Sequence, residues 1–99
     1  MKRSAHFHDD AKQELNETYA YYERVQKGLG KKFKVAVREA VLGITSMPEA
    51  HSKVWNDIRR VRVKGFKYYV IHYLVETARI TVISVFHTSR DPRIWQTRL

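Results

Sequence analysis

The sequence has no cysteine, only two prolines, four glycines and ten acidic residues. Without cysteine, a disulfide framework, a zinc–thiolate site and a thiol nucleophile are all excluded. A hydrophobic core must therefore hold the fold alone, and this chemistry suits a cytoplasmic location. Because the chain also lacks linkers, repeats and low-complexity segments, its length predicts a single domain over residues 1–99.

Long hydrophobic runs are also missing. The longest stretch without a charged residue covers only the ten residues from Ile80 to Ser89. A membrane-spanning helix needs about 20 predominantly apolar residues, so we predict no membrane association. The basic segment from Met1 to His6 is not followed by an apolar region, and we therefore expect no signal peptide.

Positive charge is what the chain has in excess. Nineteen Lys and Arg residues give a net charge of +9, while 43% hydrophobic residues are sufficient for a core. The basic residues concentrate in residues 24–38 and 59–67, and neither segment contains an acidic residue. Such an excess favours nucleic acid, an acidic protein segment or another anionic surface as partner, although it also serves solubility alone.

Apolar periodicity predicts a helix in the first part of the chain. The helix should begin at Asp9 or Asp10, because Asp10 and Gln13 have the spacing of a capping box. It should end at Gly28, where glycine tolerates the left-handed conformation. We expect Glu14 to lie off the apolar stripe and to face solvent. The stripe has steps of three and four residues: Ala11, Leu15, Tyr19, Tyr22, and Val25 or Gln26.

A second helix is predicted over residues 29–47 and is terminated by Pro48. Only Gly28 to Gly30 separate the two periodic segments, so the helices should form an antiparallel hairpin. The second apolar stripe again has helical spacing: Leu29, Phe33, Val37, Ala40, Ile44 and Met47.

Strand patterns dominate the second half. Residues 58–63, 66–75 and 80–86 predict an antiparallel meander in which 66–75 is central, because both of its faces are apolar or aromatic. Residues 4–8 predict one further short strand, and Trp95 should fold a last helical turn back onto the body. The expected fold class is α+β, with a helical hairpin packed on a small antiparallel sheet.

The acidic residues are scattered, so we predict neither a metal site nor a bound cofactor. Arginine has a planar fork suited to phosphate or carboxylate groups, and an exposed aromatic ring can stack on a base. The residues predicted to bind an acidic partner or nucleic acid belong to the two basic segments, with one strand tyrosine: Lys31, Lys32, Arg59, Arg60, Arg62, Lys64, Lys67 and Tyr73.

Metal-free RNA cleavage is a further possibility at the residue level. It needs a base, an acid and cations around the phosphate, and Arg60, His87 and Arg90 supply these types. The alternative is structural: the arginines solvate a sheet face or bind a partner's carboxylates, and His87 only bonds its turn. His72 lies between aromatic residues in mid-strand and is predicted to be packed rather than reactive.

Short segments along nearly the whole chain resemble the RelE/ParE toxin superfamily, and the match is to its ParE-like, plasmid-stabilisation branch. The ending from His87 to Arg98 is the most distinctive. The segments are Tyr21-Tyr22-Glu23, Gly28-Leu29-Gly30 followed by Phe33, Ile44 with Pro48, Arg59-Arg60, Phe66 with Tyr68, and His87-Thr88-Ser89-Arg90-Asp91-Pro92 with Trp95 and Arg98.

This resemblance implies the expected α+β fold and the cytoplasmic toxin of a type II toxin–antitoxin pair, neutralised by the tail of a cognate antitoxin. ParE-like members poison DNA gyrase, whereas RelE-like members cleave mRNA on the ribosome with basic residues and a Tyr or His. No tyrosine follows Tyr73, and this favours the gyrase-directed branch. His87 stands near the missing position and keeps the nuclease alternative open. A degenerate toxin that acts only as a partner in a repressor complex is the third alternative.

Overall fold

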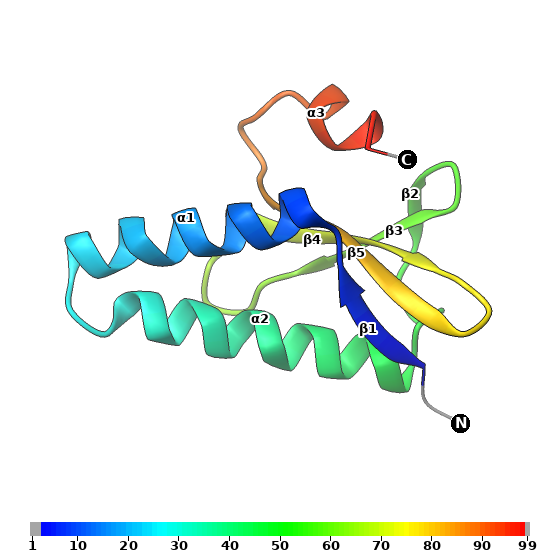
Figure 1. Cartoon of the computed structure of the whole chain (residues 1–99), viewed down its shortest axis with the longest axis horizontal. Coiled ribbons are helices and arrows are strands. Elements are labelled where there is room, and N and C mark those ends of the chain that lie inside the picture. The colour runs from blue at the N-terminus through cyan, green and yellow to red at the C-terminus, as the bar shows by residue number, and fades with distance from the viewer. Residues whose placement is uncertain (1–2, 99) are drawn as a thin grey trace.

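The computed structural model describes residues 3–98, so residues 1–2 and 99 of the predicted domain lie outside the described part (Figure 1). Helices cover one face of a sheet, and the C-terminal segment lies on the opposite side. The elements follow in the order β1 (Ser4–Phe7), α1 (Asp9–Val25), α2 (Leu29–Ser46), β2 (Lys53–Trp55), β3 (Ile58–Arg62), β4 (Tyr69–Val75), β5 (Arg79–His87) and α3 (Arg93–Gln96).

The sheet has the strand order β1-β5-β4-β3-β2. The three strands β3, β4 and β5 form the predicted antiparallel meander, and β4 lies at its centre. The predicted N-terminal strand is present as β1, but it pairs parallel to β5, from Ser4 opposite Arg79 to Phe7 opposite Val82. The sheet is therefore mixed, and its short edge strand β2 was not predicted.

The helical hairpin covers one face of the sheet as expected (Figure 1). Two of the predicted stripe positions are wrong. Val25 is 59% exposed at the end of α1, and Met47 is 66% exposed because α2 ends at Ser46. Val41, which the predicted stripe did not include, is buried. The main core on this face joins both helices to the sheet: Ala11, Phe33, Val37, Val41, Val63, Ile71, Val82 and Val85.

Two glycines shape the tight connection between α1 and α2. Gly28 has φ +89°, in the region that glycine adopts without strain. A Cβ on Gly30 would lie 2.4 Å from the carbonyl oxygen of Tyr19, so only glycine permits this close approach of the helices. The Glu23 carboxylate accepts hydrogen bonds from the amides of Gly28 and Lys31, both at 3.1 Å. The Gly28 bond is the main cause that lowers the pKa of Glu23.

The predicted capping box at the start of α1 does not form. His8 is the N-cap, and its Nδ1 accepts the backbone N–H of Asp10 at 3.1 Å. Asp10 lies inside the first turn, and Gln13 donates to the Glu17 carboxylate at 2.8 Å instead of reaching back. The helix begins two residues earlier than a capping Asp10 would require.

Glu14 is buried rather than solvated, contrary to the sequence prediction. Its carboxylate accepts the amide of Val85 at 3.0 Å and bonds to Arg90 at 3.1 Å. It also accepts two bonds from Arg98, at 2.8 and 2.9 Å, and the Arg98 side chain is only 8% exposed. One acidic residue on α1 thus joins the helix, β5 and the C-terminal segment.

The C-terminal segment covers the second face of the sheet, as predicted for Trp95. The Trp95 ring is buried and stacks on His72, with the ring centroids 3.8 Å apart and an interplanar angle of 17°. The Nδ1 of His72 lies 2.6 Å from Ser84 Oγ. Burial, helped by the nearby Arg60 and Arg98, lowers the pKa of His72 to about 3, so the ring is neutral at pH 7, in line with the predicted packed histidine.

The turn before β4 is longer than predicted. Residues 64–68 form turns, and the strand begins at Tyr69 rather than Phe66. The Phe66 ring turns inward and meets Phe33 edge-on, with the centroids 5.0 Å apart. Tyr68 instead remains 55% exposed. The turn thus places an exposed aromatic ring next to the end of β5.

Candidate functional site

The sheet register separates two of the three predicted catalytic residues. Arg60 is paired with His72, whereas His87 is paired with Tyr69. Paired side chains on neighbouring strands point to the same face, and successive residues alternate between faces. Because His72 and Tyr69 are three residues apart on one strand, Arg60 lies on the face covered by α3, and His87 lies on the face covered by the helical hairpin.

The surroundings of His87 and Arg90 are occupied by neighbouring groups. His87 Nδ1 accepts the Ser89 amide at 3.1 Å and lies 2.7 Å from the Ser89 hydroxyl. Arg90 bonds to Glu14 at 3.1 Å, and its guanidinium lies 5.0 Å from the centroid of the Phe86 ring. The structure does not bring Arg60, His87 and Arg90 together, and their catalytic use remains a hypothesis.

Two of the predicted binding residues have structural roles. Tyr73 is fully buried, and its hydroxyl donates to the Pro48 carbonyl at 2.7 Å. Burial raises the pKa of Tyr73, and the side chain has no surface on which a partner could bind, so that part of the prediction does not hold. Arg59 donates to the carbonyl of His51 at 2.6 Å and supports the loop before β2.

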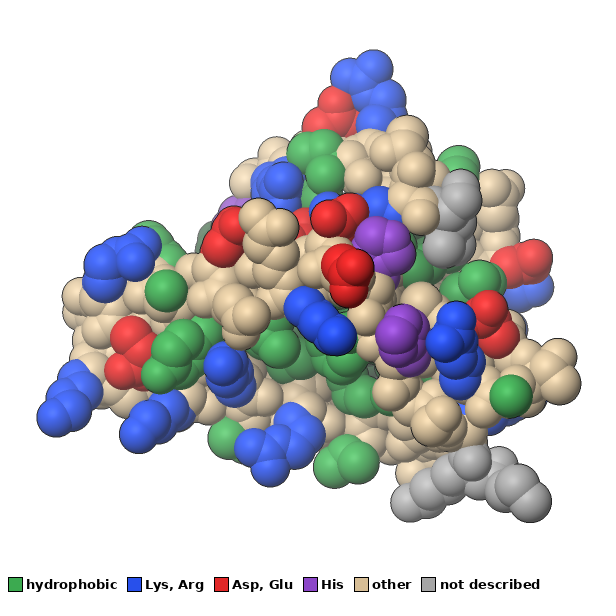
Figure 2. Space-filling view, viewed as in Figure 1, with side chains coloured by type: hydrophobic (Ala, Val, Ile, Leu, Met, Phe, Trp, Pro, Cys, Tyr) green, Lys and Arg blue, Asp and Glu red, His purple; other side chains and the backbone are tan. Residues whose placement is uncertain are grey.

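A hollow of about 390 Å³ lies between α2 and the turn that follows β3. It brings side chains of both predicted basic segments together around an apolar floor, and we call it the lysine groove. Lysine and arginine side chains crowd this hairpin end of the molecule and the outer side of α2 (Figure 2). The groove is lined by Lys31, Lys32, Val35, Ala36, Glu39, Lys64 and Phe66.

A second hollow, of about 490 Å³, opens at the β3 edge of the sheet. The ladder between β2 and β3 joins Lys53 to Arg59 and Trp55 to Ile58, and no pairing is formed there by residues 60–62. Arg60 and Arg62, two of the predicted binding residues, line this hollow, which we call the arginine cleft. The other lining residues are His51, Ser52, Val54 and Val61.

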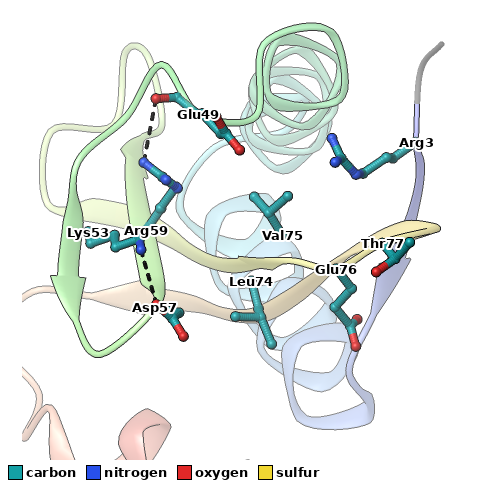
Figure 3. A pocket seen from close by; sticks show the side chains of 9 residues that line it. All are labelled: Arg3, Glu49, Lys53, Asp57, Arg59, Leu74, Val75, Glu76 and Thr77. Atoms are coloured by element: carbon teal, nitrogen blue, oxygen red, sulfur yellow. Dashed lines mark hydrogen bonds and ion pairs between the residues drawn. The ribbon is translucent and has the colours of Figure 1, made fainter.

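A third hollow, of about 310 Å³, mixes charges of both signs (Figure 3). Lys53 bonds to Asp57 at 3.0 Å, and the Arg59 guanidinium points to the backbone of Glu49. The basic and acidic side chains compensate one another, so this hollow does not select a ligand of one charge. No three His, Asp or Glu side chains among residues 3–98 are grouped so that they could hold a metal ion.

One feature of the surface was not predicted as a unit. The Tyr68 ring stacks on His87 with the centroids 5.7 Å apart and an interplanar angle of 24°. Lys67 Nζ lies 5.0 Å from the centroid of the Tyr68 ring. The sequence contained the residue types, but the stack depends on the extended turn and on the pairing of Tyr69 with His87.

Among residues 3–98, no helix combines the length and apolarity that crossing a membrane requires. A comparison with curated protein sequences gave no match. The chain is similar in structure to a chain of the chromosomal ParDE TA system from P. aeruginosa, with a TM-score of 0.74 and 14% identity. The alignment covers 87% of this chain and 96% of that one, so the two share the fold.

A comparison with protein families matches residues 5–92 to the ParE toxin of the type II toxin–antitoxin system, parDE. This match spans every helix and strand except α3 and the start of β1. It agrees with the resemblance read from the sequence and with the arrangement of the hairpin and the sheet. The chain therefore belongs to the ParE toxin family of type II toxin–antitoxin systems.

Proposed function

We propose that this chain inhibits growth by poisoning DNA gyrase in the cytoplasm and that a cognate antitoxin neutralises it at the lysine groove. The observation that supports the antitoxin contact is the groove itself. Its floor is apolar, and its lining carries three lysines from two distant segments against one acidic residue, Glu39. An acidic amphipathic segment that folds on binding presents the complementary surface, with an apolar stripe and carboxylates beside it.

The antitoxin contact is tested by charge reversal. Lys32→Glu combined with Lys64→Glu should weaken binding to the antitoxin by at least about tenfold, because two like-charge contacts replace two attractive ones. Lys12→Glu, an exposed lysine on α1, is the matched control and should change affinity little. Titration of antitoxin into purified toxin by calorimetry measures both. Equal losses in the two variants would mean that the groove is not the contact.

The gyrase target is tested with purified gyrase and supercoiled plasmid. The toxin should cause gyrase–DNA complexes with cleaved DNA to accumulate, and added antitoxin should prevent it. An unaffected gyrase at stoichiometric toxin contradicts the proposal. Mapping of transcript ends after toxin induction then separates the remaining alternatives, because ribosome-dependent cuts would identify an mRNA endonuclease, and normal growth would identify a partner that acts only in a repressor complex.

A further inference from the structure

Tyr68 presents a rigid aromatic surface to solvent. Tyr68 is 55% exposed although one face of its ring is covered. The back face lies on His87, and the Tyr68 carbonyl accepts the amide of Thr88 at 2.8 Å. His87 is held in turn by its bonds to Ser89. A ring that is ordered before binding loses little conformational entropy when a ligand stacks on it.

Cations lie directly beside this ring. Lys67 Nζ is 5.0 Å from the Tyr68 centroid, and Lys64 belongs to the same turn and also lines the lysine groove. Among residues 3–98, Lys64 and Lys67 are in none of the ion pairs. A line of available positive charge thus runs from the ring to the groove.

The surroundings of the ring are suited to a base more than to a peptide side chain. The neighbouring apolar residue of the turn, Phe66, packs against Phe33 and lines the lysine groove. The remaining turn residues before Tyr68 are Lys64, Gly65 and Lys67. A peptide anchor is buried in a pocket lined with apolar groups. A base needs only a flat ring for stacking and cations for its phosphates.

We propose that Tyr68 and Lys67 form a binding site for single-stranded nucleic acid. One base stacks on the exposed face of Tyr68 and displaces the Lys67 ammonium, which then pairs with the adjacent phosphate. The backbone continues past Lys64 towards the lysine groove. This site is a property of the toxin alone, and it can be tested without gyrase, ribosome or antitoxin.

The test is fluorescence anisotropy with a labelled 12-nucleotide strand, as DNA and as RNA of the same sequence. Tyr68→Ala should weaken binding about tenfold, because base–aromatic stacking contributes a factor of this order, and Tyr68→Phe should keep it. Tyr21→Ala is the matched control, since Tyr21 is 53% exposed and also contacts a neighbouring ring. Its effect should stay below about twofold, within the range of surface substitutions.

Lys67→Ala should reduce the slope of log binding constant against log salt concentration by about one, which corresponds to the loss of one phosphate contact. Lys12→Ala should leave this slope unchanged. The affinities for the DNA and the RNA version of the labelled strand show which of the two nucleic acids the site prefers. The inference is overturned if the wild-type toxin binds neither strand at low salt, or if Tyr68→Ala and Tyr21→Ala bind alike. It is also overturned if Tyr68→Ala weakens only the antitoxin complex, because the ring would then be a peptide contact.

Discussion

Glu14 is a buried carboxylate on which three parts of the chain depend, and its removal should be costly. Glu14→Gln keeps the shape of the side chain but leaves the Arg98 guanidinium, 8% exposed, without its buried counter-charge. Breaking a buried ion pair costs about 3–5 kcal/mol. The exposed Asp10 carboxylate still lies 3.6 Å from Arg98 Nε, so we expect the lower end of this range. At about 4–8 °C per kcal/mol for a domain of this size, the Tm should fall by at least about 12 °C.

Urea unfolding followed by circular dichroism measures this loss. Glu17→Gln on the same helix is the control, because Glu17 is exposed and, within residues 3–98, its side chain bonds only to Gln13. Its effect should stay within about 0.5 kcal/mol. The double variant Glu14→Gln with Arg98→Met should lose less than the sum of the single losses, since no unpaired buried charge remains. If Glu14→Gln unfolds at the same urea concentration as Glu17→Gln, the assigned role of the carboxylate is wrong.

Two glycines of α2 and one histidine give further tests. Gly30→Ala should destabilise the fold by about 1–3 kcal/mol through overpacking against Tyr19. Gly43→Ala should instead stabilise it by about 0.5–1 kcal/mol, because no atom lies within 4 Å of the added Cβ. Thermal unfolding should therefore show a lower Tm for the first variant and a higher Tm for the second. The pKa of His72 falls to about 3 on folding. As the pH is lowered, this histidine therefore binds a proton in the unfolded chain before it does so in the folded protein. Stability should drop between pH 6.5 and 3, by up to about 1.4 kcal/mol per pH unit, and His72→Gln should reduce this slope in urea midpoints measured against pH.

Local patterns were sufficient to predict most of the elements. The helical stripes, the turn at Gly28, the meander and the packed Trp95 follow from side-chain periodicity and backbone preference, which depend on residues only a few positions apart. The family resemblance also came from short segments in their order. The His8 cap was not predicted because aspartate caps helices more commonly than histidine does. Asp9 and Asp10 follow His8 directly, so they were the expected caps.

The sequence predictions that failed concern contacts between residues far apart in the chain. Alternation within a strand shows which residues share its faces, but it does not fix the register with the next strand. The separation of Arg60 from His87 could therefore not be predicted. Glu14 reads as a surface acid on its helix because its partner is 84 positions away. Tyr73 differs from Tyr68 in burial, and only the packing of the loop at Pro48 against the sheet shows that difference.

The bond between Glu14 and Arg98 also affects when the fold can be completed during synthesis. The two residues are separated by 84 positions, which a ribosome adds in about 4–17 s at 5–20 residues per second. Until Arg98 has been added, Glu14 lacks this partner at a position that is buried in the finished protein. The bond between Glu14 and Arg98 therefore cannot stabilise any folding step that precedes the synthesis of Arg98.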